Sequence, residues 1–189
     1  MPQPRTDRPK ISLDWTRVDT VFLDMDGTLL DLNYDNQVWS QVVPKAFAEK
    51  CGMTLQQAKL HLSEQMAGVL GTMPFYNFDY WSEFTGLDIL QLHKSAASYI
   101  RYLPGAENFL YRLKSLNKKT VIATNADRRG FDLKNQITRL GDYVDATVSS
   151  HDFQLPKERQ EFWLALQNKY PFDPTRTLFV DDTARVLDA

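Results

Sequence analysis

The chain has 189 residues, a formal net charge of -2 and a hydrophobic content of 43%, which are ordinary values for a globular protein. The near-neutral charge argues against a nucleic-acid partner, and the one cysteine, Cys51, excludes an intrachain disulfide and a cysteine-rich metal site. The chain begins without the apolar core of a signal peptide, and no apolar run reaches the roughly 18 residues of a membrane span. We therefore expect a cytoplasmic protein with no membrane partner; its oligomeric state stays open.

The first half of the chain predicts one strand followed by helices. Residues 1–17 are rich in Pro, Arg and Asp and predict a flexible lead-in. Residues 20–23 form a short apolar run that breaks into an acidic, glycine-containing loop, which favours a buried strand. Residues 34–100 show helical spacing of apolar residues and no convincing strand, with an aromatic loop over 71–80 and a last helix over 87–100.

The second half alternates between strands and helices. The apolar runs predict strands at 120–123, 146–148 and 177–180, and helices over 106–116, 131–140 and 157–170. This alternation predicts an α/β fold with a Rossmann-like parallel sheet flanked by helices. We expect a core of residues 18–33 and 101–189, into which residues 34–100 are inserted as an α-helical cap.

Polar residues follow three of the predicted strands where each strand ends. Because parallel strands end at the same edge of a sheet, and open α/β folds bind ligands at that edge, we expect these side chains to converge. They are Asp24, Asp26, Thr124, Asn125, Asp181 and Asp182. Four carboxylates in one place require a cation, and Mg²⁺ suits a set of oxygen ligands best.

Lys157 supplies a positive group near the same edge, after the short loop 151–156. A carboxylate, a divalent cation, a lysine and small polar donors suit phosphoryl transfer, which depends on positioning and charge stabilisation. An aspartate in such a site can act as the nucleophile and form an aspartyl-phosphate.

The ordered motifs resemble those of the haloacid dehalogenase-like (HAD) superfamily from about residue 18 to the end of the chain. They are an apolar strand with DMDGT at 24–28, a strand ending in Thr124, a lysine at 157 within LPKE, and an apolar strand ending in the pair 181–182. The set in this order is far more specific than the DxDGT motif alone. The resemblance implies a HAD-like core with an inserted helical cap.

The resemblance also implies a role for each residue. Asp24 is expected to be the nucleophile and a metal ligand. Asp26 is expected to be the general acid and base, and to reach the metal through its backbone carbonyl. The remaining expected roles are phosphate binding by Thr124, Asn125 and Lys157, direct metal ligation by Asp182, orientation of metal-bound water by Asp181, and support of the loop by Gly27 and Thr28.

The expected activity is Mg²⁺-dependent hydrolysis of a phosphomonoester, because Asp26 can protonate a leaving alkoxide. The runs DMDGTLLDLNYDNQVW and FDYWSEFTGLDI, with ATNAD, LPKE and LFVDD, are similar to the bacterial GMP/IMP nucleotidase branch of the superfamily. This similarity implies a purine 5′-nucleotidase acting on a small phosphorylated metabolite. The alternatives are a sugar-phosphate or phosphoglycolate-type phosphatase, and a binding module without turnover.

The alternative of a binding module without turnover arises from the C-terminal end of the sequence. Only seven residues follow Asp182, whereas the core of this superfamily normally continues with a further strand and helices. We therefore expect a truncated C-terminus.

Two further groups of residues, one aromatic and one of histidines, lie outside the motifs. Aromatic residues at 75, 76, 78, 80 and 81 fit stacking on a purine base, but packing within the cap is the more common use of such a group. His61, His93 and His151 lack the spacing of metal ligands, and we expect them on the surface or in loops.

Overall fold

A computed structural model describes residues 13–189, and its centre is a parallel sheet of four strands in the order β3-β2-β1-β4. In chain order the strands are β1 (Thr20–Leu23), β2 (Lys119–Thr124), β3 (Ala146–Ser149) and β4 (Thr177–Val180). Leu23 at the end of β1 pairs with Ile122 of β2 and Val180 of β4. The predicted strands are therefore confirmed, and three of them end side by side.

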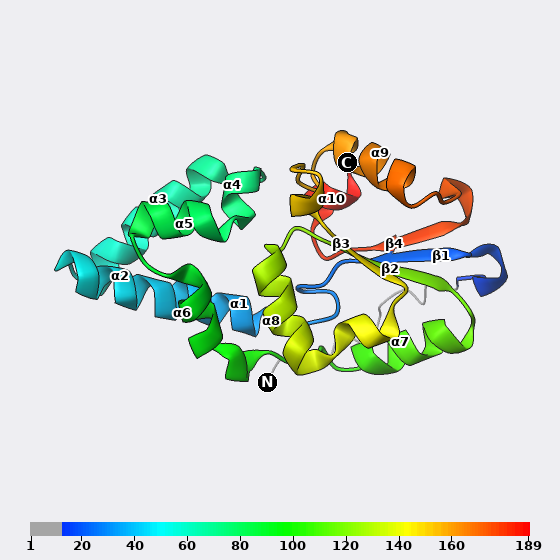
Figure 1. Cartoon of the computed structure of the whole chain (residues 1–189), viewed down its shortest axis with the longest axis horizontal. Coiled ribbons are helices and arrows are strands. Elements are labelled where there is room, and N and C mark those ends of the chain that lie inside the picture. Colours follow the sequence, from blue (N-terminus) through cyan, green and yellow to red (C-terminus); the bar gives the residue numbers. More distant parts are fainter. Residues whose placement is uncertain (1–12) are drawn as a thin grey trace, which may run out of the picture.

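Helices cover both faces of this sheet (Figure 1). Alternate residues of β1 point to opposite faces: Val21 and Leu23 pack with α7 and α8, whereas Phe22 packs with α9. The core helices are α7 (Ala106–Ser115), α8 (Arg128–Thr138), α9 (Gln160–Lys169) and α10 (Ala184–Leu187), with short 3₁₀ turns η1 (Trp15–Arg17), η4 (Leu140–Tyr143), η5 (Ser150–Asp152) and η6 (Pro174–Arg176).

The helices from α1 to η3, which lie between β1 and α7 in the chain, form the cap, and the cap lies beside the sheet in Figure 1. Its elements are α1 (Asn33–Gln37), the π-helical turn η2 (Val38–Val42), α2 (Val43–Cys51), α3 (Leu55–Val69), α4 (Met73–Tyr76), α5 (Phe78–Thr85), α6 (Ile89–Ser95) and the 3₁₀ turn η3 (Ala97–Tyr99). The cap has a hydrophobic cluster that includes Trp81 and Ile89, both almost fully buried. The α/β fold with an inserted helical cap is therefore confirmed, while the exact domain bounds stay a prediction.

The expected loop over 71–80 is wrong, because this segment forms α4 and the start of α5. Pro74 lies in the first turn of α4, where its missing N–H breaks no helical hydrogen bond. The Asn77 side chain then caps α5 by accepting from the backbone N–H groups of Asp79 and Tyr80. Proline and asparagine here begin helices rather than interrupt them. The last cap helix is also shorter than expected, since Asp88 caps α6 and the helix ends at Ser95.

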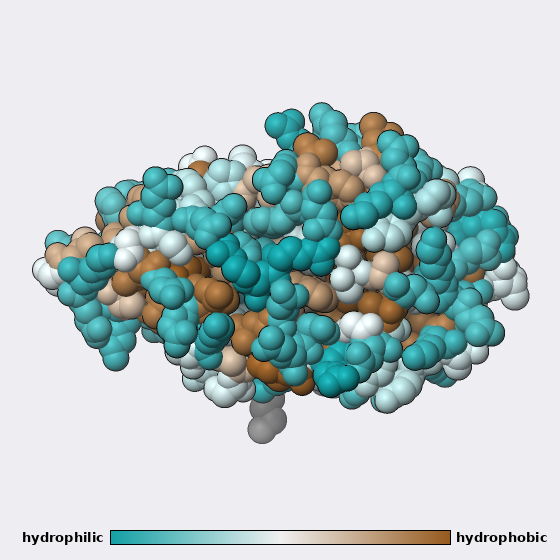
Figure 2. All heavy atoms as spheres, viewed as in Figure 1, coloured by the Kyte–Doolittle hydropathy of each residue, from teal (hydrophilic) through white to brown (hydrophobic). Residues whose placement is uncertain are grey.

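The surface seen in Figure 2 is mainly hydrophilic, with small groups of apolar residues between the polar ones. Among the described residues, no helix combines the length and apolar character needed to cross a membrane. The first 12 residues of the expected lead-in lie outside the described part of the chain.

The expected surface or loop position of His93 is wrong, because this side chain is buried in the cap with an exposed fraction of 2%. Its Nδ1 lies 2.9 Å from the hydroxyl oxygen of Tyr34, and its ring packs against that of Phe78. Burial, with the charge of Lys134, lowers the pKa of His93 to about 3 against a smaller opposing effect of Asp127.

This lowered pKa predicts a loss of stability in mild acid. Between pH 6.5 and 3 the unfolded chain binds a proton at His93 that the folded chain does not, so the free energy of unfolding falls as the pH falls. From pH 7 to pH 5 we expect wild type to lose about 2 kcal/mol more than His93→Gln in urea unfolding. The control is His61→Gln, which changes an exposed histidine of the same cap and should keep the wild-type pH dependence. An equal loss in wild type and His93→Gln would contradict the prediction.

Candidate active site

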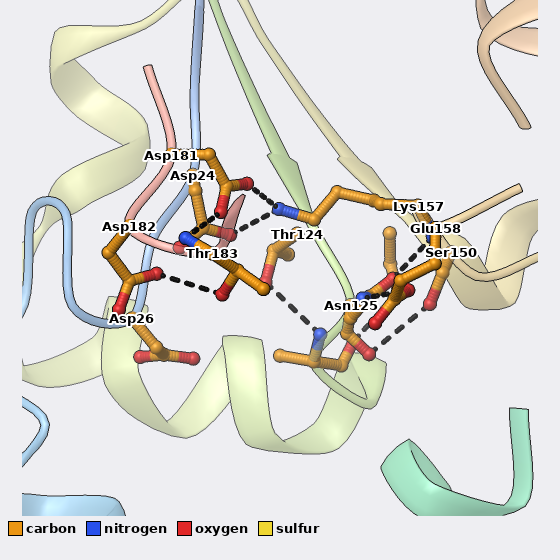
Figure 3. Close-up of polar contacts among 12 residues, drawn as sticks. Asp24, Asp26, Thr124, Asn125, Ser150, Lys157, Glu158, Asp181, Asp182 and Thr183 are labelled. Carbon is orange, nitrogen blue, oxygen red and sulfur yellow. Dashed lines mark hydrogen bonds and ion pairs between the residues drawn. The ribbon is translucent and has the colours of Figure 1, made fainter. Parts of the chain in front are cut away.

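The ends of β1, β2 and β4 bring the predicted motif residues to one edge of the sheet (Figure 3). Asp24 directly follows β1, and its backbone N–H donates to the carbonyl of Val180 at 2.9 Å. Thr124 is the last residue of β2, and Asp181 directly follows β4. The strand register therefore positions side chains that are more than 150 residues apart in the sequence.

The carboxylates of Asp24, Asp181 and Asp182 form a group that fits a metal ion. One oxygen from each lies within 4.8 Å of the others. Asp24 and Asp181 also contact Lys157, so three carboxylates and one ammonium leave a local charge of -2 when all are ionised. A divalent cation bound by oxygen ligands would balance this charge, which fits Mg²⁺.

Lys157 is the buried cation of the site, with an exposed fraction of 2%. Its Nζ lies 2.5 Å from Oδ1 of Asp24 and 2.6 Å from Oδ2 of Asp181. Burial disfavours its charge, but the two carboxylates outweigh that effect and raise the pKa of Lys157 above its usual value. The lysine therefore stays charged next to the expected nucleophile.

Asp24 is held in an environment that disfavours its negative charge. Burial raises the pKa of Asp24 to about 7, Lys157 opposes this shift, and the neighbouring Asp181 and Asp26 add to it. The protein alone thus compensates the negative charge of the Asp24 carboxylate poorly. A bound cation would favour its ionised form, which is the form that attacks phosphorus.

Asp26 and Gly27 lie in a tight turn after β1. The N–H of Gly27 donates to the carbonyl of Leu30 at 2.8 Å, and Gly27 has a φ of +88°, a value that favours glycine. Thr28 is half-buried in the same turn. The carboxylate of Asp26 is not part of the group of three acids and lies beside helix α8 (Figure 3). It forms an ion pair with Lys134 of that helix instead. Metal ligation by its backbone carbonyl stays a prediction.

Asn125 braces the loop that carries Lys157. Its Oδ1 accepts from the backbone N–H of Lys157 at 2.9 Å, and its Nδ2 donates to Glu158 at 3.0 Å. The hydroxyl of Ser150, after β3, donates to the Asn125 carbonyl at 3.2 Å. The Thr124 hydroxyl accepts from the N–H of Ala126 at 3.1 Å. Asn125 therefore orients the loop, while its expected contact with phosphate stays a prediction.

A pocket of about 350 Å³ connects these residues with the cap. Its volume is within the range of small-molecule sites. The core contributes the acids, Thr124, Asn125 and Lys157, and the cap contributes an apolar wall that includes Trp39, Met66, Phe75, Tyr76, Phe78 and Trp81. Of the five aromatic residues singled out in the sequence, Phe78 and Trp81 are buried in the cap, whereas Phe75 and Tyr76 are half-buried. These residues thus combine packing with lining of the pocket.

Sequence reasoning missed several polar residues that line this pocket or contact its lining residues. Glu158 accepts from the Tyr76 hydroxyl at 2.5 Å and so joins the cap to the core; its signal was its place next to Lys157. Lys134 and Asp35 form an ion pair across the same junction. Neither residue belongs to a recognisable motif. Lys134 lies in an amphipathic helix, where a lysine is usually exposed to solvent, so the sequence did not indicate that it is buried.

The turn at Gly27 provides a test of the metal site. A Cβ at this position would lie 2.2 Å from Oδ2 of Asp182, so Gly27→Ala must displace the Asp182 carboxylate from the group of three acids. We expect Mg²⁺ binding, measured by titration calorimetry, to weaken at least about tenfold, because an expected direct ligand moves away.

Gly105→Ala is the matched control for this substitution. Gly105 has a φ of +89°, close to that of Gly27, but an added Cβ there meets no heavy atom within 4 Å. Both alanines should cost about 1–2 kcal/mol of stability through the left-handed backbone. Only Gly27→Ala should lose Mg²⁺ affinity; equal affinities in the two variants would contradict the assignment of Asp182.

The comparisons with known proteins agree with this geometry. The family described as haloacid dehalogenase-like hydrolases matches residues 18–189. The GMP/IMP nucleotidase YrfG of Escherichia coli strain K12 is 38% identical over 179 residues, which cover 95% of this chain and 81% of that protein. The same identity and coverage hold for the GMP/IMP nucleotidase YrfG of Shigella flexneri.

Solved structures share the fold. A HAD phosphatase from Thermococcus onnurineus aligns with a TM-score of 0.76 and 21% identity, covering 88% of this chain and 78% of that one. A HAD family enzyme from Bacteroides thetaiotaomicron, in complex with magnesium and inorganic phosphate, aligns with a TM-score of 0.60 and 18% identity, covering 90% of this chain and 88% of that one. With the family match over nearly the whole chain, these findings show that the protein belongs to the haloacid dehalogenase-like hydrolases and is a phosphatase of that family.

Proposed function

We propose that this protein is a Mg²⁺-dependent purine 5′-nucleotidase that acts through an aspartyl-phosphate on Asp24. The observation that carries the chemistry is the contact of the buried Asp24 with Lys157, beside two further carboxylates that can share a divalent cation. This arrangement suits the positioning and charge stabilisation that phosphoryl transfer requires. The cytoplasmic location expected from the sequence stays a prediction.

The first step would be attack of an Asp24 oxygen on phosphorus. As the bond from phosphorus to the ester oxygen breaks, the carboxyl group of Asp26 gives its proton to that oxygen and the alcohol leaves. Water then attacks the phosphorus of the aspartyl-phosphate, and Asp26 takes its proton. Inorganic phosphate is released and the Asp24 carboxylate is restored.

Lys157 and the polar end of β2 would bind the phosphate during both steps. The Lys157 ammonium already contacts Asp24, so it would offset the negative charge that gathers where Asp24 meets the phosphate. The Thr124 hydroxyl lies at the end of the neighbouring strand and lines the pocket. Asp24, Asp182 and the backbone carbonyl of Asp26 would hold Mg²⁺, with Asp181 orienting its water; the ion would supply additional charge stabilisation for the phosphoryl group.

The purine preference is supported by the relatives named GMP/IMP nucleotidase and by the cap side of the pocket. Aromatic side chains at this wall offer faces and edges against which a base can pack. His93 also lines the pocket, and its buried Nε2 has no hydrogen-bond partner among the described residues.

The catalytic part of the proposal predicts that Asp24→Asn lowers the rate of phosphate release from GMP by at least about 10³-fold, because the nucleophile is lost. Asp19→Asn is the matched control: Asp19 precedes the same strand at its other end, is exposed, and pairs with Arg176. It should keep the wild-type rate within about twofold. Full activity of Asp24→Asn would refute the mechanism.

The metal and substrate parts are tested with the wild-type protein. A chelator should stop phosphate release and added Mg²⁺ should restore it, because the three acids need a cation. In a panel of phosphate esters, GMP and IMP should exceed a sugar phosphate and phosphoglycolate in kcat/KM. Equal kcat/KM values for all these esters would reject the proposed nucleotidase specificity but not phosphatase activity. Mg²⁺ binding without any phosphate release would indicate a binding module.

A further inference from the structure

Lys134 is a buried lysine that lies outside the four sequence motifs. It belongs to α8, the helix that begins just after Asn125, and its exposed fraction is 3%. Figure 1 shows α8 between the cap and the sheet. A lysine is almost never buried to this degree without a charged partner, because removing an ammonium from water is costly.

The partners of Lys134 come from both parts of the molecule. Its Nζ donates to Oδ1 and Oδ2 of Asp35, in the first cap helix, at 3.0 and 3.1 Å. The same Nζ lies 2.7 Å from Oδ1 of Asp26, in the turn after β1. Burial disfavours the charge of Lys134, but the two carboxylates raise its pKa above the usual lysine value. The ammonium is therefore a fixed charge between a cap acid and the expected general acid.

Asp26 depends on this contact for its orientation. The Lys134 ammonium is the cation that pairs with the Asp26 carboxylate among the described residues, and Oδ1 of Asp26 accepts no well-aligned hydrogen bond there. The side chain retains an exposed fraction of 21%. Among the described residues, no other group makes a hydrogen bond or an ion pair with this carboxylate.

Stability alone does not account for Lys134. The cost of taking a buried ion pair out of water offsets most of its attraction, and well-packed apolar residues often serve as well. The Lys134 site also lines the pocket, together with Asp26 and Asp35. Its geometry suits the orientation of a reacting group, for which a misplacement of about 1 Å can cost about 100-fold in rate.

We propose that Lys134 is a positioning residue for the reaction: it holds the Asp26 carboxylate where that group meets the leaving oxygen of the substrate, and Asp35 of the cap holds Lys134. This inference rests on the proposed phosphatase mechanism. It adds a residue from outside the motifs and connects the proton-transfer group with the first helix of the cap.

The test compares two substrates that differ in their need for a proton. Cleavage of GMP releases guanosine through its 5′-oxygen, an alkoxide that must be protonated, whereas p-nitrophenyl phosphate releases a phenolate that is stable without a proton. For each variant we consider the ratio of kcat/KM for GMP to kcat/KM for p-nitrophenyl phosphate. A partly unfolded sample lowers both values equally, so the ratio is independent of the active fraction.

We expect Lys134→Met to lower this ratio about tenfold or more, in the same direction as Asp26→Asn, because the general acid is no longer held at the leaving oxygen. Lys134→Gln, which is shorter and uncharged, is a second variant if the methionine variant does not fold. A ratio that stays at the wild-type value or rises would overturn the positioning role.

Lys118→Met is the matched control. Lys118 is also partly buried, but its Nζ donates to the carbonyls of Trp15 and Val18, before β1 and away from the pocket residues. Its loss should lower stability and leave the ratio unchanged. A similar decrease of this ratio in Lys118→Met would mean that a general loss of packing causes the effect, and it would overturn the positioning role of Lys134. Wild type that hydrolyses neither substrate in Mg²⁺ would instead reject the proposed function itself.

Discussion

The buried contact between Lys157 and Asp24 is the interaction on which the site depends. Parallel pairing of β1, β2 and β4 brings the strand ends together, and with them more negative charge than one lysine balances. Such a cluster is favoured by a compensating cation or a protonated acid, and burial, with the neighbouring Asp181 and Asp26, raises the pKa of Asp24. The proposed site for a divalent ion therefore combines the topology of the sheet with the acidic residues at its edge.

A second set of polar contacts supports the groups that face the substrate. Asn125 holds the backbone of Lys157 through its side-chain oxygen and Glu158 through its amide nitrogen. The groups proposed to react are thus anchored by neighbouring residues, and those neighbours lie at strand ends and helix starts. Such support is what allows a small shift, like the displacement of Asp182 expected from a Cβ at Gly27, to have a large chemical effect.

The sequence predicts the strands and the convergence of three of the four motif acids, because apolar runs that break into acidic residues carry both signals locally. The carboxylate of the fourth acid, Asp26, pairs with Lys134 instead. The sequence does not predict Lys134 or His93. Both lie on amphipathic helices, where a polar residue is normally assigned to the solvent face, and both are buried by packing between elements far apart in the chain. The helices around Asn77 were missed for a different reason, since proline and asparagine mark helix starts as well as turns.

The contacts that dock the cap involve the same short segments that build the site. Glu158, which accepts from Tyr76, directly follows Lys157. Asp127, which accepts from the backbone N–H of Phe78 at 3.1 Å, lies two residues after Asn125. These contacts are polar, so their strength depends on geometry more than on buried area. A change in the position of the cap must therefore alter the hydrogen bonds of residues that adjoin the proposed catalytic groups, and this gives the cap a direct physical route to influence the chemistry proposed for the core.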